Sequence, residues 1–208
     1  MKMFMDMEFT GLHQGATPIS LALRAQDGHE FYAEFTDYDQ AQINPWLLEN
    51  VVKNLIIPDR QTQNAGPIGT AFLKGRRDAI TFRLSAWLDL FDEITIIGDC
   101  LAYDWVLFCE LFGGARQLPG HMNYIPIDLS TVLAINGIDP DTSREGMAGQ
   151  WYTIPGTPHN ALHDVRVIAA IWDFLEYDSQ HRTNRVRPNF FRDGQIAEAL
   201  SSEAPHDD

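Results

Sequence analysis

The sequence predicts one α/β domain whose mixed β-sheet carries helices on both faces. Its 208 residues are 45% hydrophobic and 21% charged, which fits a globular domain and not a disordered chain or a coiled coil. Three β-rich runs open the chain, and helical patterns then alternate with short β-branched runs, an order typical of helices on both faces of a sheet. We expect this domain to span residues 1–178, with a partly disordered C-terminal extension over residues 179–208.

The first three strands are expected to be antiparallel. Residues 2–9 alternate between apolar and polar side chains in the manner of a strand. Two further β-rich runs, residues 18–26 and 29–36, are joined at Asp27-Gly28, which is a strong hairpin signal.

Helices and short strands are expected to follow. Asn44 is a suitable N-cap and Pro45 suits the first helical position, so a helix is expected over residues 44–56. Further helices are expected over residues 78–91, 103–112, 129–136 and 160–177, and strands over residues 94–97 and 125–128. Two polar or Gly- and Pro-rich segments, residues 59–77 and 137–158, are expected to be loops.

Charge and cysteine content narrow the class of protein. The formal charge is -14, from 29 acidic and 15 basic residues, whereas a protein that coats duplex nucleic acid is expected to be basic. The chain therefore binds no nucleic acid, or binds only a few nucleotides with another cation offsetting the repulsion. Cys100 and Cys109 are too few for a disulfide framework or a Cys-rich zinc site, and both are expected to be small buried side chains.

The sequence contains no membrane-spanning or secretory pattern. No apolar run approaches the roughly 20 residues that cross a bilayer. Asp6 and Glu8 interrupt the apolar residues near the N-terminus, unlike a secretory signal, so a cytoplasmic location is expected.

Asp6 and Glu8 are also unusual for their place in the first strand. They are two residues apart, so they point to the same side of the strand, about 6–7 Å apart. Because the neighbouring residues are apolar, two like charges there would repel and lose hydration. Such a pair is tolerated where the strand face is exposed to solvent or where a cation lies between the carboxylates.

Two more carboxylates lie at informative positions. Asp104 follows a buried strand at the start of a helix, where it would either cap the helix or face a ligand. Asp164 lies four residues before Ile168 on the apolar stripe of the last helix, so it points to the core. A buried carboxylate must be paired, protonated or bound to metal, and Arg166 lies on another face of the helix.

These four acidic groups could meet at one end of the sheet. Oxygen ligands suit Mg²⁺ or Mn²⁺ better than zinc or copper, and two such ions can clamp the attacking and leaving oxygens of a phosphodiester. His159 follows a loop and could take a proton from water near neutral pH, although a histidine of this kind taken alone is more simply a solvated surface group.

Three segments resemble the motifs of the DEDD 3′–5′ exonucleases. Asp6–Gly11 resembles the first motif, Ala102–Trp105 the second, and His159–Asp164 the third, in the His-x4-Asp form of the DEDDh branch. The resemblance covers roughly residues 1–175. It implies a ribonuclease H-like fold, with three antiparallel strands followed by parallel strands. It also implies release of 5′-mononucleotides from the 3′ end of a single strand, for which RNA is the expected substrate.

The resemblance also implies roles for particular residues. Two Mg²⁺ or Mn²⁺ ions would be bound by Asp6, Glu8, Asp104 and Asp164, and His159 would be the general base. Thr10 and Leu12 would lie near the terminal nucleotide. The first hairpin and the helix with Trp46 look most like small stand-alone bacterial exoribonucleases that prefer adenylate-rich RNA, and family members often form homodimers.

Several alternatives stay open. RNA is distinguished from DNA by a few contacts to the 2′-OH, so a DNA exonuclease of the proofreading or repair type is a second hypothesis. His159 and His163, four residues apart, could instead bind zinc in a hydrolase, but Asn160 stands where such a site would have glutamate. A non-catalytic RNA-binding module is a third hypothesis, although it would have no reason to keep inward carboxylates.

The remaining unusual residues have simpler interpretations. Asp99 stands where the family often has a neutral polar residue, and we interpret it as the end of a strand. Two basic clusters, Lys74–Arg77 and Arg182–Arg192, could guide a nucleic-acid backbone or could be solvated loops. Bases could stack on Trp151 and Tyr152, while Trp105 is expected in the core.

Overall fold

A seven-stranded mixed sheet forms the centre of the protein in this computed structural model, which describes residues 1–58, 63–65 and 70–181. The strands are β1 (Lys2–Phe9), β2 (Pro18–Ala25), β3 (Glu30–Phe35), β4 (Gln63–Ala65), β5 (Ala71–Gly75), β6 (Thr95–Gly98) and β7 (Ile127–Asp128). Their order across the sheet is β4-β5-β3-β2-β1-β6-β7. The three antiparallel N-terminal strands and the parallel strands β6 and β7 are present as predicted.

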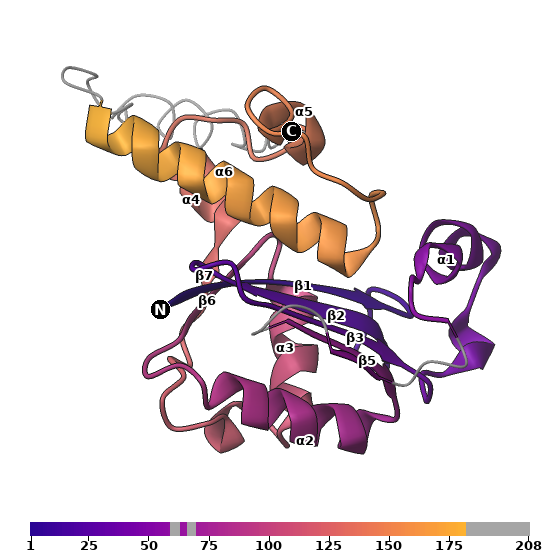
Figure 1. Ribbon diagram of the computed structural model, residues 1–208. Helices are drawn as coiled ribbons and strands as arrows, with labels where there is room; N and C mark the ends of the chain where they lie inside the picture. The colour runs from indigo at the N-terminus through magenta and orange to yellow at the C-terminus, as the bar shows by residue number, and fades with distance from the viewer. Residues whose placement is uncertain (59–62, 66–69, 182–208) are drawn as a thin grey trace, which may run out of the picture.

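Helices cover both faces of this sheet (Figure 1). They are α1 (Pro45–Asn50), α2 (Arg77–Leu88), α3 (Ala102–Leu111), α4 (Leu129–Ile135), α5 (Arg144–Ala148) and α6 (Ala161–His181), with short 3-10 turns at Gln40–Gln42, Val52–Asn54 and Ala115–Gln117. Figure 1 shows α2 and α3 on one face, α4, α5 and α6 on the other, and α1 at one end of the strands. The predicted α/β architecture is therefore confirmed.

Strand β1 contributes to both hydrophobic cores, which explains its apolar sequence. Met3, Met5 and Met7 pack with α2 and α3, while Phe4 packs on the other face with α6. Asp6 lies on the same face as Phe4, as the period of two predicts. The two candidate carboxylates of β1 are thus held by a strand whose position is fixed from both sides.

The predicted helices are present with modest shifts at their ends. Asn44 caps α1 by accepting a hydrogen bond from the N–H of Leu47 at 2.9 Å, as predicted. The helix ends at Asn50 and continues as a separate 3-10 turn, so the expected span to residue 56 was too long. Helix α2 buries Ile80, Leu84, Trp87 and Leu88, while Phe82 is 73% exposed.

Both expected loops contain regular structure, which corrects those predictions. Residues 59–77 include β4 and β5, and Lys74 of β5 reaches the buried carboxylate of Glu34 at 3.3 Å. Residues 137–158 include α5, which Ser143 caps through the N–H of Gly146 at 3.1 Å. Each is a short element whose partner is distant in sequence, so local composition does not reveal it.

Other expectations have mixed outcomes. Cys109 is buried as predicted, whereas Cys100 is exposed, which corrects that expectation. Helix α6 continues to His181, past the predicted domain end at residue 178, and the basic cluster at Arg182–Arg192 lies outside the described residues. Within the described part of the chain, no helix has the length and apolar character needed to cross a bilayer.

Candidate metal centre

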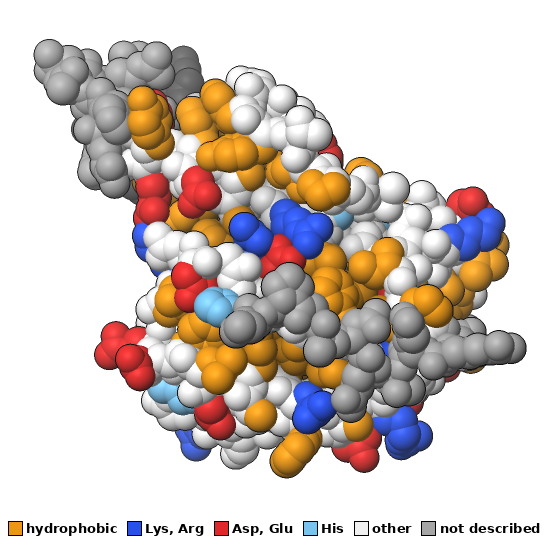
Figure 2. All heavy atoms as spheres, in the orientation of Figure 1, with side chains coloured by type: hydrophobic (Ala, Val, Ile, Leu, Met, Phe, Trp, Pro, Cys, Tyr) orange, Lys and Arg blue, Asp and Glu red, His pale blue; other side chains and the backbone are white. Residues whose placement is uncertain are grey.

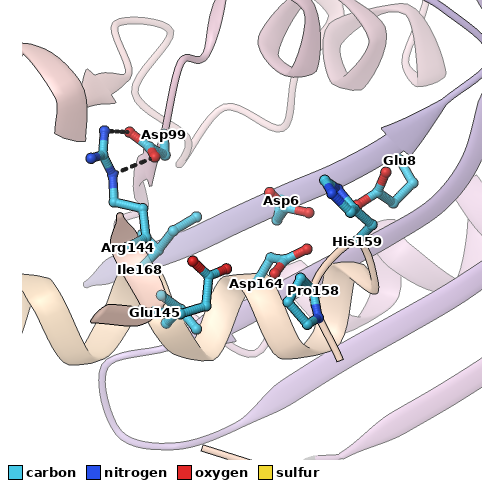
Figure 3. A pocket seen from close by; sticks show the side chains of 10 residues that line it. Asp6, Glu8, Asp99, Arg144, Glu145, Pro158, His159, Asp164 and Ile168 are labelled. Atoms are coloured by element: carbon cyan, nitrogen blue, oxygen red, sulfur yellow. Dashed lines mark hydrogen bonds and ion pairs between the residues drawn. The ribbon is translucent and has the colours of Figure 1, made fainter. Parts of the chain in front are cut away.

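Three carboxylates from β1 and α6 converge beside a cavity of about 410 Å³. Asp6, Glu8 and Asp164 each offer an oxygen, and these oxygens lie within 4.8 Å of one another. Figure 3 shows the carboxylates of the strand and the helix facing each other across this cavity. The strand and the last helix thus meet as the sequence pattern predicted.

Asp104 lies next to this group, at the start of α3. It is 8% exposed, and its Oδ1 accepts a hydrogen bond from the backbone N–H of Met7 at 2.9 Å. This bond ties Asp104 to β1 and not to its own helix, which begins without a side-chain cap. Asp104 is not among the three residues whose oxygens lie within 4.8 Å, but its charge acts on Asp6.

The crowding of these groups disfavours their ionised forms. Burial, then the charges of Asp104 and Asp164, raise the pKa of Asp6 well above its ordinary value. Burial and the charge of Asp164 raise the pKa of Glu8 to about 8. Burial also raises the pKa of Asp104 to about 7, and burial with the charge of Glu145 raises the pKa of Asp164 to about 7.

The buried carboxylate groups of this site suit a divalent cation. Asp6 Oδ2 is buried and has no hydrogen-bond partner. Burial and the charge of Asp164 raise the pKa of Glu8, and a hydrogen bond between the two carboxyl groups raises it further. Oxygen-only donors of this kind are the ligands that Mg²⁺ and Mn²⁺ prefer. The described residues therefore suit such ions, because the oxygens of Asp6, Glu8 and Asp164 lie close enough to share one and Asp104 lies beside them.

His159 lies at the rim of the cavity, where it lines the space together with the carboxylates. Its backbone has a φ of 61°, in the left-handed region, and its ring contacts the edge of Trp46 at a centroid distance of 5.0 Å. Its backbone N–H also donates to the carboxylate of Asp164. The imidazole is thus exposed but oriented from two sides.

A pair of asparagines, which the sequence analysis did not single out, holds the loop that carries His159. Asn160 Oδ1 accepts from the N–H of Leu162 at 3.1 Å, and its Nδ2 donates to the carbonyl of Asn54 at 2.7 Å. Asn54 Nδ2 in turn donates to the carbonyl of Pro158 at 3.1 Å. The only local signal was the position of Asn160 directly before a helix, which is typical of a cap.

Asp99 and Arg144 form the opposite wall of the cavity. Asp99 follows β6 directly, as interpreted, and it also accepts hydrogen bonds from Arg144 at 2.7 and 3.1 Å (Figure 3). Arg144 further donates to the hydroxyl of Ser130 at 3.0 Å. This guanidinium, absent from the sequence-based candidates, is the cation that lines the described cavity.

The residues expected near a terminal nucleotide have different environments. Thr10 is buried, and its hydroxyl bonds to Gln42 and to the N–H of Thr17. Leu12 is 72% exposed, so its side chain is accessible to a ligand. Trp151 is also exposed, but it already stacks on Phe174 at 3.9 Å.

Three predictions about neighbouring residues can be compared with the structure. Trp105 packs against the core as expected. Arg166 bonds Glu30 at 2.7 and 2.8 Å, which agrees with its assignment to a different face from Asp164. His163 lies inside α6 and is buried, whereas His159 precedes the helix and is exposed, so the two do not form a helical i, i+4 pair.

The chain is similar in sequence to characterised nucleases. It is 30% identical over 121 residues to the 3′-5′ exoribonuclease Rv2179c of Mycobacterium tuberculosis strain ATCC 25618 / H37Rv, and the same values hold for the 3′-5′ exoribonuclease MT2234.1 of strain CDC 1551 / Oshkosh. The alignment covers 57% of this chain and 66% of each relative, just under two thirds of their length. No family model matches the chain.

Solved structures share the fold at low sequence identity. A full-length 3′-exonuclease has a TM-score of 0.59 at 14% identity, over 86% of this chain and 82% of that one. Pop2p of S. pombe in a form with Mg²⁺ and Mn²⁺ has a TM-score of 0.56 at 16% identity, over 86% of this chain and 83% of that one.

A third match is the nuclease domain of 3′hExo, described as a DEDDh family member bound to rAMP. It has a TM-score of 0.56 at 14% identity, over 85% of this chain and 92% of that one. The resemblance drawn from the three sequence motifs is therefore confirmed: the chain has the ribonuclease H-like fold of the DEDDh 3′-exonucleases and is similar in sequence to 3′-5′ exoribonucleases.

Proposed function

We propose that the chain is a metal-dependent 3′–5′ exoribonuclease that hydrolyses the terminal phosphodiester of single-stranded RNA. The observation that carries this proposal is the meeting of Asp6, Glu8 and Asp164 beside a cavity with His159 at its rim. The 3′-5′ exoribonucleases that the chain resembles in sequence support the same reaction.

The carboxylates would hold two Mg²⁺ or Mn²⁺ ions. Asp6, Glu8 and Asp164 are the proposed direct ligands, with Asp104 completing the set from α3. When bound, the ions activate a water nucleophile and neutralise the charge that develops on the phosphodiester. This choice of ions is supported by the Mg²⁺ and Mn²⁺ form of the structurally similar Pop2p.

His159 is the proposed general base. A neutral imidazole at the rim can accept the proton of the attacking water near neutral pH. Trp46 limits the rotation of the ring, and the Asn54–Asn160 pair fixes the backbone on either side of it. Thr10 and Leu12, at the end of β1 and just beyond it, are the proposed contacts of the 3′-terminal nucleotide.

A time course on matched oligomers tests the reaction, its direction and its sugar preference together. Labelled single-stranded RNA and DNA of the same sequence, and an oligoadenylate, are incubated with Mg²⁺ or Mn²⁺ and with EDTA. We expect 5′-labelled RNA to shorten stepwise from its 3′ end, oligoadenylate fastest, and EDTA to stop the reaction. RNA that stays intact with both metals would contradict the proposal.

DNA remains the substrate of the second hypothesis, an exonuclease of the proofreading or repair type. The two hypotheses share the same carboxylates, and they differ in whether the site reads a 2′-OH. Faster loss of the DNA oligomer than of the RNA oligomer in that time course would favour the DNA enzyme.

Two other hypotheses have less support. A zinc site on His159 and His163 is disfavoured by their separation between the loop and the helix, and no metal-like group of three among the described residues includes His159. A non-catalytic RNA-binding module leaves the buried, unpartnered Oδ2 of Asp6 without a purpose.

The broader context of the reaction is also part of the proposal. We infer a role in RNA processing in the cytoplasm and assembly as a homodimer, as the family resemblance implies. Light scattering on the purified full-length chain gives the mass in solution, and a monomer at all accessible concentrations would rule the homodimer out.

A further inference from the structure

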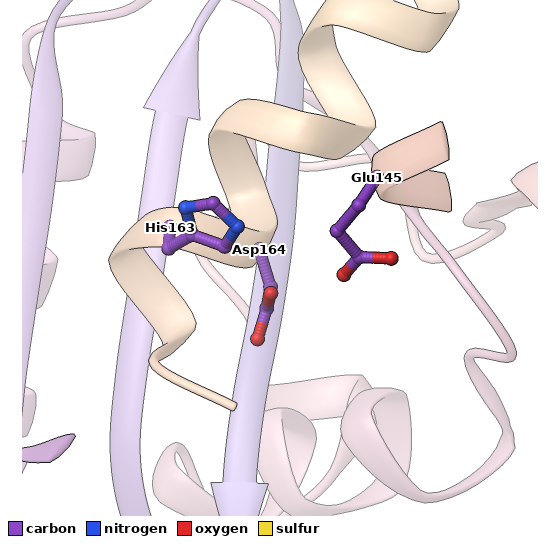
Figure 4. A group of neighbouring side chains, drawn as sticks. All are labelled: Glu145, His163 and Asp164. Carbon is purple, nitrogen blue, oxygen red and sulfur yellow. The ribbon is translucent and has the colours of Figure 1, made fainter. Parts of the chain in front are cut away.

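A second group of possible ligands adjoins the candidate metal centre, and one of its members, Glu145, lines the same cavity. Glu145 of α5 and His163 and Asp164 of α6 each offer one ligand atom, and these atoms lie within 4.8 Å of one another. Figure 4 shows the three side chains projecting from the two helices toward a common region. The group shares only Asp164 with the centre formed by Asp6 and Glu8.

His163 supplies an independent sign of a ligand. It is only 7% exposed, and its Nε2 is buried without a hydrogen-bond partner. Its Nδ1 lies 3.2 Å from the carbonyl oxygen of Pro155. Because a carbonyl can only accept, Nδ1 is the nitrogen that donates here, which leaves Nε2 as the nitrogen available to a ligand.

The loop before α6 fixes the orientation of this ring. Gly156 has a φ of +122°, and a Cβ added there would lie 2.8 Å from the Cβ of His163 and 3.0 Å from its Nδ1. The backbone therefore packs directly against the imidazole, and Pro155 binds one of its nitrogens. A histidine that donates one N–H to a carbonyl and offers the other nitrogen is the usual arrangement in protein metal sites.

The spacing of the group suits an ion better than direct hydrogen bonds. Nε2 of His163 bonds neither carboxylate, although the ligand atoms of the group are within 4.8 Å. A cation about 2.0–2.2 Å from each nitrogen and oxygen would occupy such a gap. It would also separate the like charges of Glu145 and Asp164 and give the buried Nε2 of His163 a partner.

We propose that Glu145, His163 and Asp164 bind one divalent transition-metal ion of the Zn²⁺ or Mn²⁺ type. An imidazole nitrogen with two carboxylates favours these ions over Mg²⁺, which prefers oxygen ligands and retains water. The inference concerns metal binding alone, so it holds whether or not the chain is a nuclease.

Binding of Co²⁺, a coloured substitute for Zn²⁺, tests the site in the full chain with excess Mg²⁺ present. We expect one equivalent to bind with a visible absorption band. His163→Gln and Glu145→Gln should each weaken this binding by roughly 10- to 100-fold, the usual effect of disturbing a metal site. His29→Gln, in the turn between β2 and β3, is the matched control and should bind as the wild type does.

Asp6→Asn distinguishes this site from the candidate catalytic centre. That variant should lose nuclease activity and still bind Co²⁺, because Asp6 is not part of the second group. Glu145 is exposed, so its substitution tests the site even where His163→Gln fails to fold. The proposal is wrong when the wild type binds no Co²⁺, when Glu145→Gln binds it as tightly as the wild type, or when Asp6→Asn abolishes binding.

Discussion

Some side chains at this site are buried in a way that destabilises the fold when no metal is bound. Asp6 is the clearest example, because one of its oxygens is buried and unbonded, and burial together with four neighbouring carboxylates raises its pKa. Replacing a buried charge by a neutral group of the same shape removes both the desolvation and the repulsion. Asp6 therefore opposes folding and is expected to be retained for metal binding.

Asp6→Asn separates these two effects. We expect it to abolish nuclease activity and to raise the stability of the metal-free protein, because it removes the burial cost and the repulsion that raise the pKa of Asp6. Urea unfolding in EDTA measures the stability. A variant that is less stable than the wild type in EDTA would show that Asp6 contributes to the fold.

His159 is the residue whose loss should affect the rate most selectively. We expect His159→Ala to fold normally and to lower the turnover rate by roughly 10²- to 10⁴-fold, the usual contribution of a general base. Initial rates on 3′-labelled oligoadenylate measure the effect, and His29→Ala serves as the control. Unchanged turnover in His159→Ala would assign the base to another group.

The separate residues of the site differ in how well the sequence predicts them. Asp6 and Asp164 could be identified because a charge breaks an apolar period of the strand or the helix. Arg144 could not, since its partner Asp99 is 45 residues away and lies in a different element. Exposed Cys100 was also missed, because its φ of 51° belongs to a turn that local composition does not specify.

Among the elements, the start of α6 decides where His159 and Asp164 lie. Asn160 caps the helix with its oxygen and reaches Asn54 with its nitrogen. The loop before α6 and the turn after α1 are therefore fixed to each other. Through this connection, the position of α6 determines where His159 lies.

Asn160→Ala tests that connection. We expect a loss of about 1 kcal/mol from the missing cap and a lower turnover rate, because the loop that carries His159 is released. Asn136→Ala, which removes a side-chain bond to Val132 at the end of α4, is the matched control and should keep its turnover rate. Equal turnover in the two variants would show that the Asn54–Asn160 pair serves stability alone.

The elements that the sequence failed to predict share one physical feature. Strand β5 pairs in parallel with β3 across a long connection, and α5 is five residues long and buries only Met147 and Ala148. Their stability comes from tertiary contacts, so neither propensity nor period reveals them. By contrast, β1 and α6 have strong periods of their own, and the sequence predicts both.

For the whole molecule, the net charge of -14 and the clustered carboxylates make stability depend on pH and on metal. Glu8, Asp104 and Asp164 have pKa values of about 8, 7 and 7 in the folded state, against 4.5, 3.8 and 3.8 as ordinary values. Between about pH 4 and pH 8, these three carboxyl groups bind more protons in the folded protein than in the unfolded chain. Stability in EDTA must therefore fall as the pH rises from about 4 to about 8, and it should level off above that.

A divalent cation reverses this trend, which gives the last prediction. Mn²⁺ binds the deprotonated carboxylates and competes with protons, so it should bind more tightly at pH 8 than at pH 6. A ligand that binds only the folded state stabilises it more when it binds more tightly. Mn²⁺ should therefore raise the melting temperature more at pH 8 than at pH 6. Thermal melts with Mn²⁺ and with EDTA at both pH values measure this difference. Asp6→Asn is the control, because this variant should lose the part of the Mn²⁺-dependent increase at pH 8 that comes from the centre formed by Asp6, Glu8 and Asp164. An equal shift at both pH values in the wild type would mean that the carboxylates are already ionised at pH 6 and that their crowding does not require a cation.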